Sequence, residues 1–155
     1  MATGDGREEM LTTDFHRVQK LGASHPEIEV IPGPGSPPEE YQLVLHVPGV
    51  MREGGEVKPI SLHRVRVVLG PDYPARAPDL FWETPVFHPN IAPPRVCLQG
   101  RLYAAGVTLD EIFLTMAQMV DYRLYNVKSV LNKEAGAWAL ENAHRLPLKG
   151  PRGER

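Results

Sequence analysis

The spacing of hydrophobic residues changes along the chain, and in the first segment it is the spacing of a helix. A helix is predicted from a cap at Thr12 or Thr13 to a stop at Gly22 and Pro26. Residues 1–10, which precede it, are polar and acidic, and we expect a flexible tail there. The predicted buried face of the helix carries Leu11, Phe15, Val18 and Gly22.

The next part of the chain has the spacing of extended strands. A short strand is expected before the turn-rich residues 32–38, and alternating apolar residues then predict two half-buried strands on either side of a loop at Gly54 and Gly55. A further short strand follows them. The predicted strands cover residues 27–31, 41–47, 63–69 and 80–83.

Helical spacing returns in the last third of the chain. Thr108 and Glu111 form a capping box, because each side chain can pair with a free backbone amide at a helix start. A polar connection over residues 121–129 leads to a last helix capped by Asn132, and a tail rich in Pro, Gly and charge begins at Pro147. The apolar stripes of these helices are Leu109, Ile112, Phe113, Met116 and Val120 in the first and Ala135, Trp138 and Ala139 in the second.

The order of helix, antiparallel strands and helices is typical of the α+β class. No repeat or long linker divides the 155 residues, so we expect one domain over residues 11–146 between flexible tails at 1–10 and 147–155. The 14 glycines and 16 prolines indicate a loop-rich folded domain, since the apolar segments between them are periodic.

The net charge and the cysteine content limit the binding partners and the cellular compartment that we expect for the protein. A formal net charge of -2 gives no electrostatic case for nucleic acid or an anionic membrane, and no apolar run approaches the roughly 20 residues that span a bilayer. We expect no signal peptide, because the N-terminus is polar and acidic. A single cysteine cannot form an internal disulfide or a cysteine-rich metal site, and it fits a cytoplasmic protein.

Residues 87–98 combine the only cysteine, Cys97, with a His-Pro-Asn tripeptide at residues 88–90. Pro93 and Pro94 between them exclude a helix interior and remove ladder donors, so the segment is predicted to be extended, looped chain. Loops held by a rigid scaffold frequently carry reactive groups.

Residue chemistry alone leaves the role of Cys97 open. A lone cysteine between two apolar residues is more often a buried structural residue than a nucleophile. A thiol hydrolase needs a histidine in contact with the sulfur, and His88 is the candidate, although its ring could equally brace the loop. The scattered histidines lack the spacing of a helical zinc site, and residues 32–38 lack the lysine of a phosphate-binding loop, so we expect no metal and no cofactor.

Several short motifs in the second half of the chain resemble the signature of ubiquitin-conjugating enzymes. That family reads YPxxxP, an aromatic strand, HPN, and a catalytic cysteine between an apolar residue and leucine. The corresponding residues here are Tyr73-Pro74-Ala75-Arg76-Ala77-Pro78, Trp82, His88-Pro89-Asn90 and Val96-Cys97-Leu98, and Val130-Leu131-Asn132-Lys133-Glu134-Ala135 resembles the start of a late helix. The resemblance implies the UBC fold, with an N-terminal helix, a four-stranded antiparallel meander, a catalytic loop, a crossing helix and a C-terminal helix.

The family's chemistry implies that Cys97 is a carrier. A ubiquitin-like protein, held as a thioester on an activating enzyme, would pass to Cys97, and a lysine of a protein target would then attack the new thioester. Asn90 matches the position of an amide that stabilises the developing oxyanion, or it braces the turn by bonding to backbone. The resemblance gives His88, next to Pro89, a structural role.

By the same resemblance, Asn126 and Ser129 fall where polar residues gate the incoming lysine, although capping the next helix is the simpler interpretation. His16, Arg17 and Lys20 on the first helix match the surface that meets the activating enzyme. A solvated helix face is the plainer alternative for these three residues.

The chain departs from the family at the surfaces that ligases use. Tyr103-Ala104-Ala105-Gly106 stands in place of the family's Trp-Ser-Pro-Ala, so Tyr103 can replace only the packing of the tryptophan. The YPARAP loop presents Ala75 and Arg76 without a protruding aromatic residue, which weakens the case for a conventional ligase. Such divergence resembles the small conjugation systems of bacteria, some of which are linked to phage defence.

Two alternatives to the conjugating enzyme stay open. A non-catalytic scaffold of the same fold would bind a ubiquitin-like protein, but such variants typically lack the cysteine. A thiol hydrolase would need a base near the sulfur, for which the sequence offers only His88.

Overall fold

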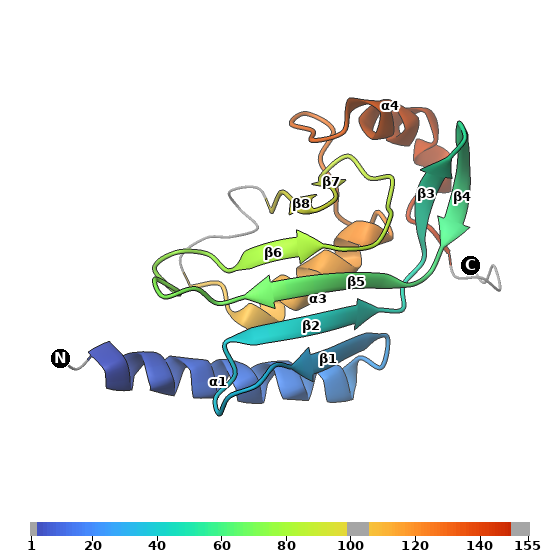
Figure 1. The fold of residues 1–155 in the computed structure, drawn as a ribbon. Helices are drawn as coiled ribbons and strands as arrows, with labels where there is room; N and C mark the ends of the chain where they lie inside the picture. Colours follow the sequence, from blue (N-terminus) through green and yellow to red (C-terminus); the bar gives the residue numbers. More distant parts are fainter. Residues whose placement is uncertain (1–2, 99–105, 150–155) are drawn as a thin grey trace.

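A four-stranded antiparallel sheet with helices on one face forms the body of the molecule (Figure 1). The computed structural model describes residues 3–98 and 106–149. The strands lie in the order β1-β2-β5-β6, which confirms the predicted four-stranded sheet and the α+β class. Their bounds are Ile28–Pro32 for β1, Glu40–Leu45 for β2, His63–Val68 for β5 and Asp79–Trp82 for β6.

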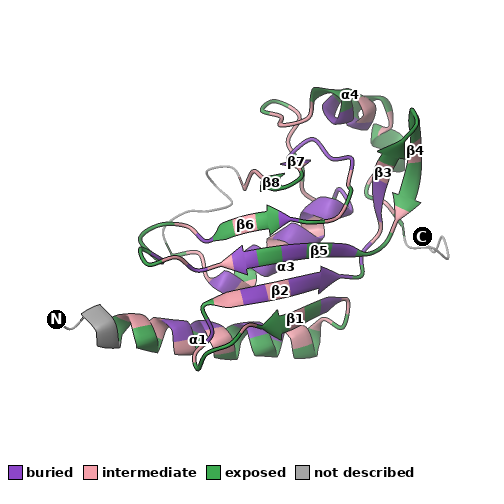
Figure 2. Ribbon diagram, in the orientation of Figure 1, coloured by how far each residue is buried: buried purple, intermediate pink, exposed green. Residues whose placement is uncertain are grey.

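Alternating burial explains why the sheet packs on one face. In β5, Val65 and Val67 are buried, whereas the two arginines that alternate with them are exposed, as expected for the half-buried strand predicted at residues 63–69. The buried face meets helix α3 (Leu109–Val120), whose Phe113 ring contacts the Tyr41 ring of β2 nearly edge-on, with 5.8 Å between the ring centroids. Figure 2 shows buried residues concentrated in β2, β5 and α3, with exposed residues alternating between them in β5.

Helix α3 begins as the sequence predicted. The backbone N–H of Thr108 donates to Oε1 of Glu111 at 3.0 Å, which is one half of the capping box. All five apolar residues of the predicted stripe are buried, so α3 fills the centre of the main core. Within residues 3–98 and 106–149, no helix combines the length and the apolar character needed to cross a membrane.

Helix α1 (Thr3–Ser24) starts earlier than predicted, because residues 3–10 are helical and not part of a flexible tail. The guanidinium of Arg7 donates to the backbone oxygens of Tyr73 at 2.8 Å and Leu69 at 3.3 Å. These contacts join the first turns of the helix to a loop far along the chain. Local sequence could not reveal them, and the early start was therefore missed.

The sequence analysis also missed a hairpin. β3 (Gly49–Glu53) and β4 (Glu56–Ile60) pair antiparallel where only a loop was expected. Gly54 and Gly55 at its tip have positive φ angles of 58° and 84°, the conformation that a two-residue hairpin turn requires. The hairpin turns away from the main sheet towards the C-terminal segments (Figure 1).

A second core joins this hairpin to the C-terminal part of the chain, and it consists of Val50, Phe87, Tyr122, Ala135 and Ala139. Helix α4 (Lys133–Glu141) contributes two of these residues. It begins at Asn132 as predicted, because Oδ1 of Asn132 accepts the N–H of Ala135 at 3.0 Å. A 3₁₀ turn, η1 (Ala143–Arg145), follows it.

The chain beyond η1 is partly ordered against this second core. Leu146 and Leu148 pack on it, and the N–H of Leu148 donates to the backbone oxygen of Asp121 at 2.8 Å. Leu148 thus contacts the second core, although it lies in the segment 147–155 that was predicted to be a flexible tail. The physical reason is that two leucines at alternate positions of extended chain point to the same side, which is apolar here.

Gly49 gives a first test of the packing between β3 and the main core. A Cβ at this position would lie 2.9 Å from Cε1 of His63 and 3.1 Å from Cγ2 of Val120. We expect Gly49→Ala to lower the free energy of unfolding by about 1–3 kcal/mol, because the buried side chains of His63 and Val120, or β3 itself, must shift to admit the methyl group.

The measurement is urea unfolding of the wild type and the variant. Gly6→Ala is the control, since a Cβ at Gly6 in α1 meets nothing within 4 Å. Alanine there should raise the free energy of unfolding by up to about 1 kcal/mol through helix propensity. Equal stability of Gly49→Ala and the wild type would contradict the close packing at β3.

His63 gives a pH-dependent test. Its ring is fully buried, and Nε2 donates to the backbone oxygen of Val47 at 3.0 Å. Burial lowers the pKa of His63 from 6.5 to about 4, and the hydrogen bond to Val47 offsets only part of this effect. Between pH 6.5 and about pH 4, His63 binds a proton in the unfolded chain but not in the folded protein.

The free energy of unfolding should therefore fall as the pH is lowered through this window, by up to about 1.4 kcal/mol per pH unit from His63. In His63→Leu this contribution disappears. The slope of the free energy of unfolding against pH should therefore become smaller by up to about 1.4 kcal/mol per pH unit, which corresponds to one proton. Urea unfolding at several pH values measures both slopes, and other titrating groups cancel in their difference. Identical slopes would rule out a neutral, buried His63.

Candidate active site

A short hairpin presents Cys97. β7 (Ile91–Ala92) and β8 (Arg95–Val96) pair antiparallel, and the N–H of Trp82 in β6 donates to the backbone oxygen of the hairpin's second proline at 2.9 Å. Cys97 follows β8 directly, is partly exposed, and donates its backbone N–H to the oxygen of Asn90 at 2.9 Å. The structure thus places the cysteine on an irregular loop that is fastened to the sheet.

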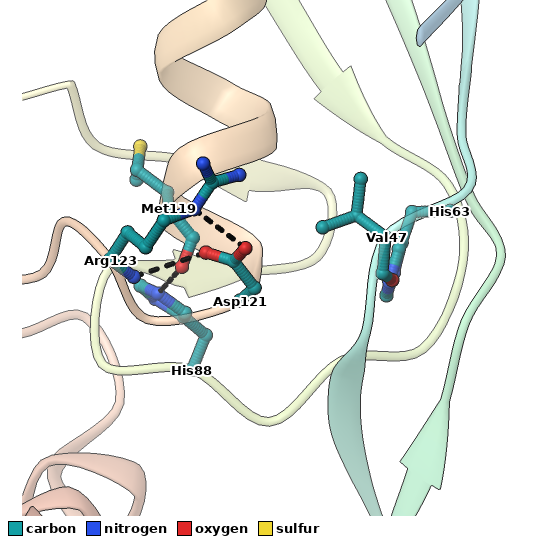
Figure 3. Close-up of polar contacts among 6 residues, drawn as sticks. All are labelled: Val47, His63, His88, Met119, Asp121 and Arg123. Atoms are coloured by element: carbon teal, nitrogen blue, oxygen red, sulfur yellow. Dashed lines mark hydrogen bonds and ion pairs between the residues drawn. The ribbon is translucent and has the colours of Figure 1, made fainter. Parts of the chain in front are cut away.

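His88 joins this loop to the last turn of α3 (Figure 3). Its Nε2–H donates to the backbone oxygen of Met119 at 2.6 Å, and its Nδ1 accepts the N–H of Asn90 at 3.0 Å. The ring is fully buried, and this burial lowers the pKa of His88 to about 4, so the ring is neutral at physiological pH. Both ring nitrogens are engaged, which leaves neither to take a proton from Cys97.

Asn90 connects the cysteine to a second loop. Its side-chain amide donates to the backbone oxygens of Asn126 at 3.0 Å and Ser129 at 3.1 Å, and its Oδ1 accepts the N–H of Asn126 at 2.8 Å. Asn90 itself is 2% exposed, whereas its partners Asn126 and Ser129 are half-buried and exposed. Asn90 therefore holds residues 126–129 next to the hairpin that carries Cys97.

The structure brings Asn126 and Ser129 to the site, but not as helix caps. Oδ1 of Asn126 accepts the N–H of Lys128 at 2.7 Å, which closes a local turn, and Ser129 is exposed. The cap of α4 is Asn132. The simpler interpretation of Asn126 and Ser129 as caps of the next helix is therefore wrong.

Pro89 supports the same junction. It is buried, and its backbone oxygen accepts the N–H of Leu131 at 2.8 Å and that of Asn132 at 3.2 Å. The tripeptide at residues 88–90 thus reaches α3, the loop at 126–129 and the start of α4 at once.

Tyr122 is a site residue that sequence reasoning missed. Its hydroxyl donates to the backbone oxygen of Phe87 at 2.6 Å, and its ring lies 4.6 Å from the His88 ring, centroid to centroid. It adopts a positive φ of 69°, which is unusual for a residue other than glycine. No glycine marks the end of α3 in the sequence, so the left-handed turn there had no local signal.

The turn after α3 is closed by an ion pair that Figure 3 also shows. The carboxylate of Asp121 accepts from Nε of Arg123 at 2.7 Å and from the backbone N–H of Arg123 at 3.1 Å. Burial raises the pKa of Asp121, and the contacts with Arg123 oppose that rise. The pair closes the turn just after Met119, whose backbone oxygen accepts the Nε2–H of His88.

The remaining predicted residues are not part of this junction. His16, Arg17 and Lys20 are exposed on α1, which lies next to β1 at one edge of the sheet, whereas β7 and β8 lie beyond β6 at the opposite edge (Figure 1). Tyr103 lies outside the described residues. Across residues 3–98 and 106–149, no group of three or more His, Cys, Asp or Glu side chains is arranged to hold a metal ion.

The chain has relatives among known proteins. "Ubiquitin-conjugating enzyme E2 S" of Danio rerio is 32% identical over 140 residues, which cover 86% of this chain and 59% of the relative. "Ubiquitin-conjugating enzyme E2 S-A" of Xenopus laevis is 35% identical over 95 residues, which cover 58% of this chain and 42% of the relative. The chain thus spans about half the length of these curated relatives.

A solved structure gives the same fold. The E2 domain of a Toxoplasma gondii ubiquitin conjugating enzyme superposes with a TM-score of 0.62 over 91% of this chain and 90% of that one, at 20% identity. No family model matches the chain. The animal relatives named above do not bear on the predicted bacterial system. The chain therefore has the fold of a ubiquitin-conjugating enzyme domain, and over most of its length it is similar in sequence to ubiquitin-conjugating enzymes.

Proposed function

We propose that this protein accepts a ubiquitin-like protein as a thioester on Cys97 and transfers it to an amine of a protein target. The observation that carries the proposal is the double role of Asn90. Its backbone oxygen holds the N–H of Cys97, and its side chain holds residues 126–129. The thiol and the loop that would border an incoming lysine are therefore fixed to one buried residue.

The proposed reaction has two exchange steps. The Cys97 thiolate attacks the thioester carbonyl on the activating enzyme, whose own thiolate leaves, and the ubiquitin-like protein is then bound to Cys97. A target amine attacks this second thioester, the Cys97 thiolate leaves, and the amine loses a proton as an isopeptide bond forms. Because both acyl donors are already activated thioesters, little acid–base machinery is required in the resting enzyme.

The engagement of His88 supports a carrier over a thiol hydrolase. A hydrolase needs a base in hydrogen-bond contact with the sulfur, whereas both nitrogens of His88 bond to backbone groups. Asn90 likewise donates both amide hydrogens to carbonyl oxygens in this structure. We therefore assign it first the role of a positioning residue, and stabilisation of an oxyanion would require one of these bonds to open.

Three kinds of protein partner follow from the proposal. The ubiquitin-like protein binds covalently at Cys97, and the activating enzyme docks on the exposed residues His16, Arg17 and Lys20 of α1. The target protein approaches past Asn126 and Ser129. The YPARAP loop exposes Ala75 and Arg76 and no aromatic side chain, which supports a weak or altered use of ligases.

A charging assay tests the carrier role directly. With ATP, the cognate activating enzyme and the cognate ubiquitin-like protein, the wild type should give an adduct that reductant removes. In Cys97→Ser the adduct should resist reductant and be cleaved by hydroxide, because an oxygen ester replaces the thioester. A non-reducing gel distinguishes the two products.

The scaffold alternative predicts a different result in the same assay. A scaffold would bind the ubiquitin-like protein without forming an adduct, and Cys97→Ala would bind as tightly as the wild type. Absence of an adduct with the cognate pair, together with such binding, would overturn the proposed function. Cleavage of the Cys97 thioester by water, without transfer of the ubiquitin-like protein to any amine, would favour the hydrolase.

Asn90→Ala tests the positioning role. The variant should be charged normally but should pass the ubiquitin-like protein to free lysine about tenfold to a hundredfold more slowly, because the loop at residues 126–129 is no longer held in register. Single-turnover discharge of the charged enzyme measures this rate. Amide hydrogen exchange at Asn126, whose N–H bonds to Asn90, should become faster in the same variant.

Asn126→Ala is the matched control, since it removes only the local turn to Lys128 and keeps the backbone groups that Asn90 contacts. We expect a smaller loss of discharge rate from this change. Slow discharge with unchanged exchange at Asn126 would contradict the positioning role and favour direct stabilisation of the oxyanion.

A further inference from the structure

A cleft with a cavity volume of about 600 Å³ lies between the β3–β4 hairpin and the C-terminal segment. β4 forms one wall, and the chain that follows η1 forms the other. We call it the C-terminal cleft. It is lined by Val50, Val57, Lys58, Pro59, Trp138 and the continuous segment 144–149.

The charged side chains of the C-terminal cleft are all basic. Lys58, Arg145 and Lys149 line it together with His144, and none of its lining residues carries a carboxylate. Lys58 pairs with Glu53 at 3.0 Å, whereas Arg145 and Lys149 form no ion pair with any described residue. The chain as a whole has a net charge of -2, so this positive surface is a local feature.

The floor of the C-terminal cleft is apolar. The half-buried ring of Trp138 contacts the rings of Phe87 at 6.2 Å and Tyr122 at 5.8 Å, centroid to centroid, so the second core fixes its position. The guanidinium of Arg145 lies 6.0 Å from the centre of the Trp138 ring. The Arg145 guanidinium also donates to Oδ1 of Asn142 at 2.5 Å. A ligand would therefore meet an apolar surface with two cations at its edge, Arg145 and Lys149, which form no ion pair with a described residue.

We propose that the C-terminal cleft binds a short acidic segment of a partner protein, with one apolar side chain against Trp138 and its carboxylates near Arg145 and Lys149. The volume fits a few residues of peptide, and pockets with an apolar floor and a few polar anchors are typical ligand sites. This inference goes beyond the proposed function, because the cleft does not contain Cys97 and binding requires no thioester.

The surroundings of the cleft favour a short peptide over a nucleic acid. Glu53 and Glu56 are exposed on the tip of the adjacent hairpin, and Glu141 is exposed at the end of α4. A long polyanion that extended beyond the cleft would meet these carboxylates. A peptide with charges on only a few residues would not.

Fluorescence anisotropy with two labelled peptides tests the proposal. The probes are acetylated and amidated Glu-Asp-Phe-Glu-Asp and its basic counterpart Lys-Lys-Phe-Lys-Lys, and the protein is the full chain without ATP or other proteins. We expect the acidic peptide to bind and the basic one not to bind. Binding should weaken as salt rises from about 50 mM to about 300 mM, and it should change the emission of Trp138, since the other tryptophan is buried in β6.

Charge reversal locates the binding. The double variant Arg145→Glu, Lys149→Glu should weaken binding of the acidic peptide about tenfold or more. The control Arg64→Glu, Arg66→Glu changes the net charge equally on exposed residues of β5 that do not line the cleft, and binding should stay within about twofold of the wild type. Circular dichroism checks that each variant is folded, and Lys149→Glu alone, with an expected loss of about threefold, serves if the double variant does not fold.

The results of these binding experiments can support or overturn the proposed peptide site. Unchanged binding after charge reversal, or equal binding of the two peptides, would overturn the proposal. Tighter binding of a labelled oligothymidylate of equal charge would replace the peptide by a nucleic acid. Because Cys97→Ser should bind the acidic peptide like the wild type, failure of this inference and failure of the carrier role are distinguishable.

Discussion

The burial of the HPN turn, residues 88–90, as a fully hydrogen-bonded unit is the constraint on which the rest of the site depends. Its histidine bonds to the end of α3, its proline to the start of α4, and its asparagine to both the loop at 126–129 and the backbone of Cys97. Buried polar groups without such partners would cost free energy, so the turn has one favourable arrangement. A protonated histidine could not accept the N–H of Asn90, so the lowered pKa of His88 belongs to the same constraint.

In this arrangement, the residues that position Cys97 are different from the groups that react. The buried turn fixes the position of Cys97, while the chemistry that we propose is supplied largely by thioesters that arrive already activated. A site of this kind needs a fixed geometry more than it needs a strong base. The hydrogen bonds of the buried turn provide that geometry, and because they occupy both ring nitrogens of His88, this histidine is not available as a base.

The second core extends the same junction towards the C-terminus. Tyr122 contacts His88 on one side and Trp138 on the other, so aromatic rings run from the HPN turn to the floor of the C-terminal cleft. The hairpin of β3 and β4 closes this core, and the N–H of Phe87 donates to the oxygen of Val50 at 2.7 Å. Elements that the sequence analysis treated as a loop and a tail thus complete the support of the site.

The sequence by itself determined the strands of the main sheet, the caps at Thr108 and Asn132, the buried stripe of α3 and the motif around Cys97, because local periodicity and short motifs carry that information. Only the tertiary structure decided the early start of α1, the order of Leu148 and the partners of Asn90. Each depends on backbone groups far apart in the chain, such as the oxygen of Tyr73 beside Arg7. Local pattern has no access to such contacts, since they exist only after the chain has folded.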